Sequence, residues 1–341
     1  MSGLLVLRAG PGMTVQDMGR PGYMEFGLSR GGAMDRLALH EGAALLGHSP
    51  RLAAIEMAGI GGEFEAMRDL RIALTGAPMA ARIDGAAVAW NACHKLPRGA
   101  RLTIGSATKG VYGYLSVGGG IDTGIFRGSR SAHLAAGIGA PVAAGQILAV
   151  GDDPTPDRVG LGLRPADRLG GGTVRMVAGP QTHLFDSDTL RRFTEEPLRR
   201  DNRGNRMGLR LLPDGPGFGS AAGLTILSEI VIPGDIQITG DGTPYVLMAE
   251  CQTTGGYPRI GTVLPADLPR IAQAAPGTVL RFALVDRAAA IAIERAERAR
   301  IGKLARQTFP LLRDPATIPD LLSYQLISGV TAGDELEGDR Q

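Results

Sequence analysis

The sequence predicts a mainly β protein made of two tandem β modules, with few helices and a helical C-terminal extension. Its 51 glycines among 341 residues are spread along the chain rather than clustered. Spread glycine between short apolar runs indicates many tight turns, which is typical of all-β domains. A faint internal repeat points to duplication, since residues 30–34 recur as residues 203–207, an offset of 173. We therefore hypothesise two copies of one module, near residues 1–105 and 174–285.

The same reading divides the chain into three parts. The first β module is expected over residues 1–155, the second over 173–290, and the helical extension over 291–341. A stretch rich in Pro, Asp and Gly between residues 152 and 172 is expected to link the two modules.

Helical segments are few. Residues 34–46 carry apolar side chains at helical spacing, with Asp35 near the start. The longest candidate spans residues 286–307, an Ala-rich run whose expected inner stripe contains Ile291, Ile293, Ile301 and Leu304. Shorter helices are expected at residues 187–193 and 267–273.

Composition argues against several classes of protein. No run approaches the length of about 18 apolar residues that marks a membrane span, and the N-terminus lacks the basic region of a secretory signal, so a cytoplasmic location is expected. A net charge of +2 and an aromatic content of 4% argue against a nucleic-acid groove. Cys93 and Cys251 are expected to be free thiols, and the spacing of the histidines predicts no metal site.

The most distinctive motif is Gln252-Thr-Thr-Gly-Gly-Tyr-Pro-Arg-Ile260, which follows an apolar run at residues 245–249 that predicts a buried strand. The two glycines are expected to allow positive φ, and their N–H groups to form an anion-binding nest. Asp267, shortly after the motif, is either a general base or a helix cap. The candidate substrate-binding residues here are Gln252, Thr253, Thr254, Gly255 and Gly256, and the candidate catalytic residues are Tyr257, Arg259 and Asp267. The alternative is a turn between strands whose hydroxyls bond their own backbone.

A second group of candidates lies near the N-terminus. Arg20 is a candidate catalytic residue that would clamp a carboxylate or phosphate, and Gln16 would bond a carbonyl or amide. Asp17 either joins this site or pairs with Arg20 inside the protein. Asp35 either contacts substrate or stabilises the start of a helix.

Arg206 is the remaining catalytic candidate. Its apolar neighbourhood indicates partial burial, and a buried arginine needs either an internal acid or an anionic ligand. We expect the guanidinium and hydroxyl groups of Arg20, Arg206 and the 252–260 motif to converge on one cleft that takes a small negatively charged molecule.

Eight ordered segments carry a resemblance to a known family: residues 14–22, 31–35, 74–77, 114–121, 128–131, 206–211, 236–237 and 252–260. Taken in this order, they resemble the biotin-dependent carboxyltransferase family, also called allophanate hydrolase subunit 2. The resemblance runs from about residue 4 to residue 285. The family includes the C subunit of bacterial 5-oxoprolinase, the antagonist of the sporulation-kinase inhibitor, and the A/B half of the urea carboxylase carboxyltransferase domain.

The resemblance implies a pair of cyclophilin-like β-barrels and an enzyme made of several subunits. The function that the resemblance implies first is that of the C subunit of an ATP-dependent 5-oxoprolinase. This subunit would act with a B subunit that resembles allophanate hydrolase subunit 1, and with an A subunit, to open 5-oxoproline to glutamate. The resemblance makes ATP the implied cofactor. Biotin would act only through a separate carrier, because this chain has no Met-Lys-Met motif. The alternatives are the carboxyltransferase half of a urea or amide carboxylase, and a regulatory binding subunit without turnover.

The chain departs from the family pattern close to Arg206. Asn205 stands where the family often has Asp, and Glu250 stands where it often has Asp. The change at Asn205 removes one expected anionic partner of Arg206.

Overall fold

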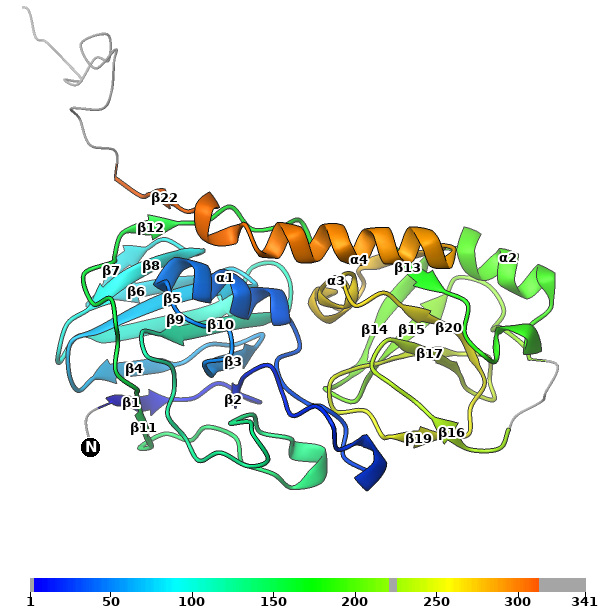
Figure 1. Cartoon of the computed structure of the whole chain (residues 1–341), viewed down its shortest axis with the longest axis horizontal. Helices are drawn as coiled ribbons and strands as arrows, with labels where there is room; N and C mark the ends of the chain where they lie inside the picture. The colour runs from blue at the N-terminus through cyan, green and yellow to red at the C-terminus, as the bar shows by residue number, and fades with distance from the viewer. Residues whose placement is uncertain (1–2, 221–225, 313–341) are drawn as a thin grey trace, which may run out of the picture.

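The computed structural model describes residues 3–220 and 226–312, which form two β-rich lobes (Figure 1). The predicted fold class is confirmed: the described residues are mainly strands and turns, with few helices. The helices are α1 (Arg36–Leu46), α2 (Ser187–Glu195), α3 (Leu268–Gln273) and α4 (Arg287–Ile301), and the short 3-10 turns are η1 (Met24–Phe26), η2 (Leu134–Ala136), η3 (Thr182–Leu184) and η4 (Leu304–Gln307). In this described part of the chain, no helix has the length and apolar character needed to cross a membrane.

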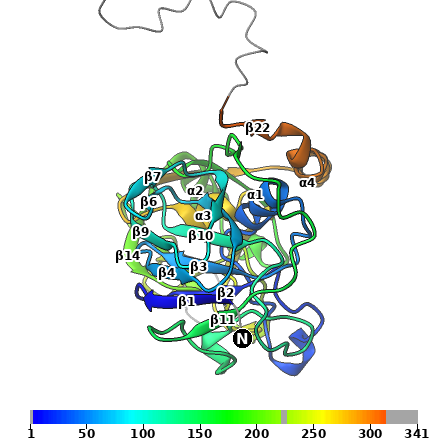
Figure 2. The ribbon, with the colours of Figure 1, turned by 90° about the vertical axis from the view of Figure 1, so that its left-hand side faces the viewer.

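The first lobe packs one sheet against another around a shared core. Its strands are β1 (Gly3–Arg8), β2 (Thr14–Gln16), β3 (Ala54–Ala58), β4 (Glu63–Ala66), β5 (Leu70–Gly76), β6 (Met79–Ile83), β7 (Ala86–Val88), β8 (Ala92–Leu96), β9 (Arg101–Ala107), β10 (Tyr112–Val117), β11 (Ile147–Ala149) and β12 (Leu161–Gly162). One sheet has the order β11-β1-β4-β9-β6-β7 (Figure 2). The other runs β2-β3-β10-β5-β8-β12-β22, where β22 (Phe309–Pro310) comes from the end of the described chain. Alternate apolar residues from both sheets, such as Phe64 and Leu115, fill the core.

The second lobe is a closed barrel, as a cyclophilin-like fold requires. Its strands are β13 (Gly172–Val177), β14 (Leu198–Gly204), β15 (Gly208–Pro213), β17 (Asp235–Ile238), β18 (Pro244–Leu247), β20 (Arg259–Val263) and β21 (Val279–Leu284), in the order β13-β20-β17-β18-β15-β14-β21. The parallel pair β13 and β21 closes the barrel. A separate small sheet pairs β16 (Glu229–Ile230) with β19 (Thr254–Gly255).

The repeat at an offset of 173 residues is wrong as a structural register. It would superpose helix α1 on strand β15, which starts at Gly208. The strand orders of the two lobes also differ, and the parallel pair of the barrel has no counterpart among the strand pairs described in the first lobe. Short glycine-rich turns recur in β proteins for conformational reasons, so local matches of this kind do not establish a duplication.

The predicted helices form at or next to the expected positions, because their N-terminal signals are present. Asp35 caps α1 by accepting a hydrogen bond from the Ala38 backbone, and Asp286 caps α4 through Ala289. Helix α4 runs along the top of Figure 1 from the second lobe toward the first. Ile291 was expected on its buried face but is exposed, whereas Leu304 is buried.

The end of the described chain returns to the first lobe. Strand β22 (Phe309–Pro310) pairs with β12, which in turn pairs with β8. The link after residue 155 therefore contributes a strand to the first lobe, and the extension does so as well. An apolar segment at residues 318–327, expected to be a second helical piece, lies outside the described residues.

The lobes share a hydrophobic core. Met34, Tyr112 and Tyr114 of the first lobe belong to the same buried cluster as the barrel residues Phe193 and Phe282. Polar side chains reinforce the junction: the amide of Gln273 on α3 donates to Asp35 and to the Tyr112 carbonyl, each at 2.8 Å. Arg168, in the link, forms a bidentate pair with Glu41 and also bonds Asp35. These contacts hold the lobes in one arrangement.

Candidate functional site

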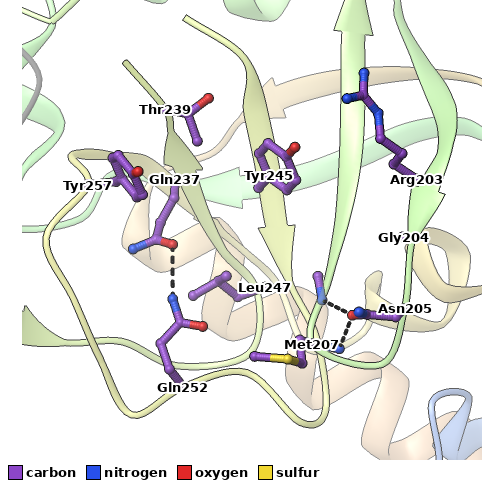
Figure 3. A pocket seen from close by; sticks show the side chains of 11 residues that line it. Arg203, Gly204, Asn205, Met207, Gln237, Thr239, Tyr245, Leu247, Gln252 and Tyr257 are labelled. Atoms are coloured by element: carbon purple, nitrogen blue, oxygen red, sulfur yellow. Dashed lines mark hydrogen bonds between the residues drawn. The ribbon is translucent and has the colours of Figure 1, made fainter. Parts of the chain in front are cut away.

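One cavity of about 370 Å³ opens on the barrel lobe, and we call it the amide pocket (Figure 3). The hairpin β14–β15, strands β17 and β18 and the loop after β18 all contribute to it. Strand alternation turns Gln237 and Tyr245 toward the pocket, while Ile236, Ile238 and Val246 enter the core. The lining residues are Arg203, Gly204, Asn205, Met207, Gly208, Gln237, Thr239, Tyr245, Leu247, Gln252 and Tyr257.

Two glutamine amides face each other across this pocket. The amide nitrogen of Gln252 donates to the Gln237 side-chain oxygen at 3.4 Å. Gln237 is 3% exposed, and its own amide nitrogen finds no partner in the part of the chain that the structure describes. A buried donor without an acceptor costs about 1–3 kcal/mol. A ligand oxygen that accepts from Gln237 would remove this cost.

The rest of the lining is hydroxylic and apolar. Tyr245 and Tyr257 bring phenol groups, and Tyr257 is 43% exposed at the mouth. Arg203 contributes one guanidinium, which is largely exposed and only 3.5 Å from a carboxylate oxygen of Asp201. The lining contains no carboxylate. The arrangement therefore suits a small amide-containing molecule, either neutral or singly negative.

Arg206 stands between the pocket residues Asn205 and Met207 in the sequence, but its side chain turns into the junction of the lobes. Its guanidinium pairs with Glu56 of β3 and with Glu250, and donates to the Gly32 carbonyl at 2.6 Å. Burial lowers the pKa of Arg206, but the two carboxylates outweigh burial and raise it above the usual value. The second oxygen of Glu56 accepts from the Tyr114 hydroxyl at 2.6 Å and from the Met34 backbone at 2.8 Å. Arg206 is thus an internal bridge between the lobes.

The change at Asn205 does not leave Arg206 without an acid. The Asn205 side-chain oxygen accepts from the backbone N–H groups of Met207 and Gly208 and closes the β14–β15 turn. Glu56 and Glu250 supply the negative charge instead. Neither pairing is local in sequence, since Glu56 lies 150 residues before Arg206.

The 252–260 motif divides between the pocket and the framework. Gln252 and Tyr257 line the pocket. Thr253 and Thr254 instead belong to the edge of the small sheet, where the Thr253 carbonyl accepts from the Val231 backbone. The structure therefore brings only part of the motif together.

The predicted glycine nest is not formed. Neither Gly255 nor Gly256 has positive φ, so their N–H groups do not take the alternating conformation that a nest needs. Gly255 is required for close approach: a Cβ there would lie 2.4 Å from the amide nitrogen of Gln237. Its role is to admit the Gln237 side chain.

Arg259 and Asp267 are occupied by internal partners. The Arg259 guanidinium pairs with Glu229 at 2.5 Å and Asp235 at 3.2 Å, and also bonds Gln181. Asp267 receives bonds from the Arg175 side chain and backbone at 2.5–2.8 Å. Each predicted catalytic group is therefore satisfied within the barrel, and Asp267 does not cap α3 with its side chain.

The N-terminal candidates also hold the framework. The Asp17 carboxylate accepts from the backbones of Gly19 and Arg130 and from the hydroxyls of Ser129 and Ser131, and these bonds hold two loops together. They take the place of the internal Asp17–Arg20 pair, which was one of the two alternatives for Asp17. Arg20 donates to the Ser131 and Phe126 carbonyls.

The side chains of Gln16 and Asp35 also bond other parts of the protein. The Gln16 amide donates to Thr14 and to the Ala132 carbonyl. Asp35 caps α1 and bonds Arg168. Within residues 3–220 and 226–312, the single cleft expected to gather these groups is not formed.

Most lining residues of the pocket, including Gln237, Tyr245 and Arg203, were absent from the sequence-based candidates. The sequence does contain a signal for Gln237, because this polar residue stands between Ile236 and Ile238 in a pattern that predicts a strand. A polar side chain there must leave the core face of the barrel. No comparable signal singles out Arg203 among the many arginines of the chain.

Comparison with known proteins decides the family. Residues 26–284 match the family model described as the carboxyltransferase domain, subdomain A and B. The chain belongs to this family. Within the carboxyltransferase A/B family, it is 37% identical over 292 residues to the 5-oxoprolinase C subunit of Escherichia coli strain K12, covering 82% of this chain and 90% of that protein. It is 31% identical to the 5-oxoprolinase C subunit of Haemophilus influenzae, covering 86% of this chain and 94% of the relative.

Solved structures agree with the fold. The crystal structure of TTHA0988 is 32% identical with a TM-score of 0.76, and the alignment covers 83% of this chain and 55% of that one. This carboxyltransferase A/B chain therefore spans about half the length of TTHA0988. The urea amidolyase of K. lactis superposes with a TM-score of 0.81 at 24% identity, over 92% of this chain and 21% of that one, which supports the fold alone.

Proposed function

We propose that this chain is the C subunit of a 5-oxoprolinase, which works with partner A and B subunits in the ATP-dependent opening of 5-oxoproline to glutamate. The main support for this proposal is the similarity of the chain to two 5-oxoprolinase C subunits over at least 90% of their lengths. The amide pocket adds a chemical reason, because its cavity of about 370 Å³ suits a small ring that bears an amide.

The pocket residues have complementary groups for such a lactam. Gln237 presents an unpartnered amide N–H, which suits the lactam carbonyl oxygen. The Gln252 amide oxygen suits the lactam N–H, and Tyr257 or Arg203 suits the ring carboxylate at the pocket mouth. Together these groups would orient the ring and hold its carbonyl oxygen in place during activation.

The amide pocket does not fit a nucleoside triphosphate. Its lining holds a single guanidinium and no carboxylate to retain magnesium. ATP supplies the free energy that opens an unstrained lactam, but the amide pocket is assigned only the lactam.

The test is kinetic and uses the assembled enzyme. The chain is co-expressed with the A and B subunits of its own organism, and ATP-dependent glutamate release from 5-oxoproline is measured. Gln237→Ala and Gln252→Ala should each raise KM for 5-oxoproline about tenfold, since losing one ligand hydrogen bond costs about 1.4 kcal/mol. Arg191→Ala, on the exposed face of α2, is the matched control and should leave KM unchanged.

Two results would count against the proposal in different ways. A stable complex that releases no glutamate in the presence of ATP would reject the 5-oxoprolinase assignment. Normal release with unchanged KM in both glutamine variants would keep the enzyme but remove the lactam from this pocket.

A second function has a specific observation in its favour. The urea amidolyase of Saccharomyces cerevisiae is 25% identical over 79% of this chain, which corresponds to 16% of that protein. Urea carries the same carbonyl and amide groups that the glutamine pair would recognise. Urea-dependent ATP turnover by the complex together with a biotin carrier and carboxylase, without turnover of 5-oxoproline, would favour a carboxyltransferase.

A further inference from the structure

Glu250 is a buried carboxylate that lies behind the amide pocket rather than in its lining. Its side chain is 2% exposed, and it stands two residues before Gln252 in the sequence. Two walls of the pocket are not strands. One is the turn between β14 and β15, which carries Asn205 and Met207, and the other is the loop that begins at Gln252 and ends at Tyr257. Glu250 and its neighbours are bonded to the first wall and lead directly into the second.

Glu250 holds the β14–β15 turn through Arg206. One carboxylate oxygen accepts from the Arg206 Nε at 2.5 Å, and the Glu250 backbone N–H donates to the Arg206 carbonyl at 2.8 Å. A third bond runs from the Met248 backbone N–H to the Met207 carbonyl at 2.9 Å. The turn and the segment that leads into the Gln252 loop therefore cannot separate without breaking these bonds.

The other carboxylate oxygen ties the same segment to the first lobe. It accepts from the Ala135 backbone N–H of η2 at 3.0 Å, and the Gly31 backbone N–H donates to the Ala249 carbonyl at 3.0 Å. Both donors belong to the first lobe. A pocket that is built on the barrel thus takes part of its shape from the other lobe.

The chemistry of these bonds requires a carboxylate at residue 250. Each Glu250 oxygen receives an N–H donor, one from Arg206 and one from Ala135. A glutamine would bring a single acceptor oxygen, and its amide nitrogen would face the second donor with N–H groups of its own. The bond to Arg206 is also charge-assisted, and such bonds are roughly twice as strong as those between neutral groups.

His133 does not share this charge at neutral pH. Its Nδ1 lies 3.8 Å from the second Glu250 oxygen and accepts from the Ala136 backbone N–H at 3.3 Å, which fits the neutral ring. Burial lowers the pKa of His133 below its ordinary value, although the charge of Glu250 acts in the opposite direction. Arg206 therefore supplies the positive charge that balances Glu250.

We infer that Glu250 is a positioning residue of the amide pocket, which sets the separation between the β14–β15 turn and the Gln252 loop. The glutamine pair depends on that separation, because Gln252 reaches Gln237 at 3.4 Å and a displacement of about 1 Å would take its amide out of range. The ordering of the two walls rests on these contacts alone, whereas its effect on 5-oxoproline rests on the proposed function.

The first test is kinetic and uses the assembled enzyme. Glu250→Gln should raise KM for 5-oxoproline about tenfold and change kcat less than about twofold, because the walls shift while the ligand-binding groups remain. Glu250→Asp keeps the charge and should raise KM less than about threefold. Gln273→Leu is the control: it removes the junction bonds to Asp35 and to the Tyr112 carbonyl, so it should lower Tm and leave KM unchanged.

The second test needs no substrate. Hydrogen exchange followed by mass spectrometry on the full isolated chain reports the backbone amides of residues 203–208 and 252–257. Glu250→Gln should speed exchange in both segments at least about tenfold, and Gln273→Leu should leave both unchanged. Ala135→Pro removes the first-lobe donor without removing a charge, and it should speed exchange of residues 252–257 even where Glu250→Gln does not fold.

The inference is overturned by unchanged exchange in both segments of Glu250→Gln, or by an unchanged KM in that variant. Unchanged exchange of residues 252–257 in Ala135→Pro, or an equal rise in KM for Gln273→Leu, would overturn it as well. Faster exchange with the expected pattern, in a chain whose assembled complex releases no glutamate, would reject the proposed reaction and keep the positioning role of Glu250.

Discussion

At the scale of single residues, the decisive feature is how buried arginines are paired. Arg206 and Arg259 are conspicuous in the sequence, and a buried guanidinium needs a negative partner. The structure satisfies both with internal carboxylates, namely Glu56 and Glu250 for Arg206 and Glu229 and Asp235 for Arg259. This internal pairing marks both arginines as framework residues rather than ligand contacts.

Arg206→Ala should strongly destabilise the protein. Removal of the guanidinium leaves Glu56 and Glu250 buried without their partner, which typically costs about 3–5 kcal/mol of unfolding free energy. Urea denaturation followed by circular dichroism measures the change. Arg191→Ala removes exposed pairs with Asp188 and Glu195 and should cost less than about 1 kcal/mol. Equal stability of the two variants would contradict the bridging role of Arg206.

At the scale of elements, the small sheet of β16 and β19 supports the amide pocket from behind. Gly255 in β19 lets the Gln237 side chain pass, and neither glycine of the pair takes the positive φ that the sequence predicts. The need for space beside Gln237, rather than a need for positive φ, thus explains why residue 255 is glycine. The motif is a support for a pocket that strands β17 and β18 largely build.

Gly255→Ala should displace the Gln237 amide and impair the pocket while the fold persists. The new Cβ would lie 2.4 Å from the Gln237 amide nitrogen, which belongs to the end of a flexible side chain and can move. We expect KM for 5-oxoproline in the assembled complex to rise several-fold. Gly256→Ala is the matched control, because its Cβ would meet its nearest neighbour at 3.3 Å. Equal KM values for the two variants would contradict the proposed role of Gly255.

At the scale of the whole molecule, the two lobes form one structural unit. Their buried cluster is continuous, Gln273 and Arg206 cross the junction, and β22 brings the described end of the chain back to β12. Figure 1 shows α4 lying across the top of both lobes. The two lobes are therefore held in one arrangement by a shared core.

Cutting the link should not separate the lobes. A protease site inserted between Pro156 and Asp157, where the link is exposed, allows cleavage of the folded protein. The two fragments should co-elute in size-exclusion chromatography and unfold in a single thermal transition, because the shared core persists. In concentrated urea the same sample should separate. Independent elution under native conditions would show that the lobes are autonomous.

The sequence by itself determined the fold class, the main helices and the family, because these depend on local signals. Asp35 and Asp286 cap helices within a few residues, spread glycines mark turns, and ordered motifs survive along the chain. Only the tertiary structure decided which polar residues face a ligand. Glu56 and Arg206 are 150 residues apart, and Asp17 meets Ser131 across 114 residues. Pairing at that distance depends on how lobes and loops pack, and it consumed most of the expected site, while strand alternation in the folded barrel exposed Gln237 instead.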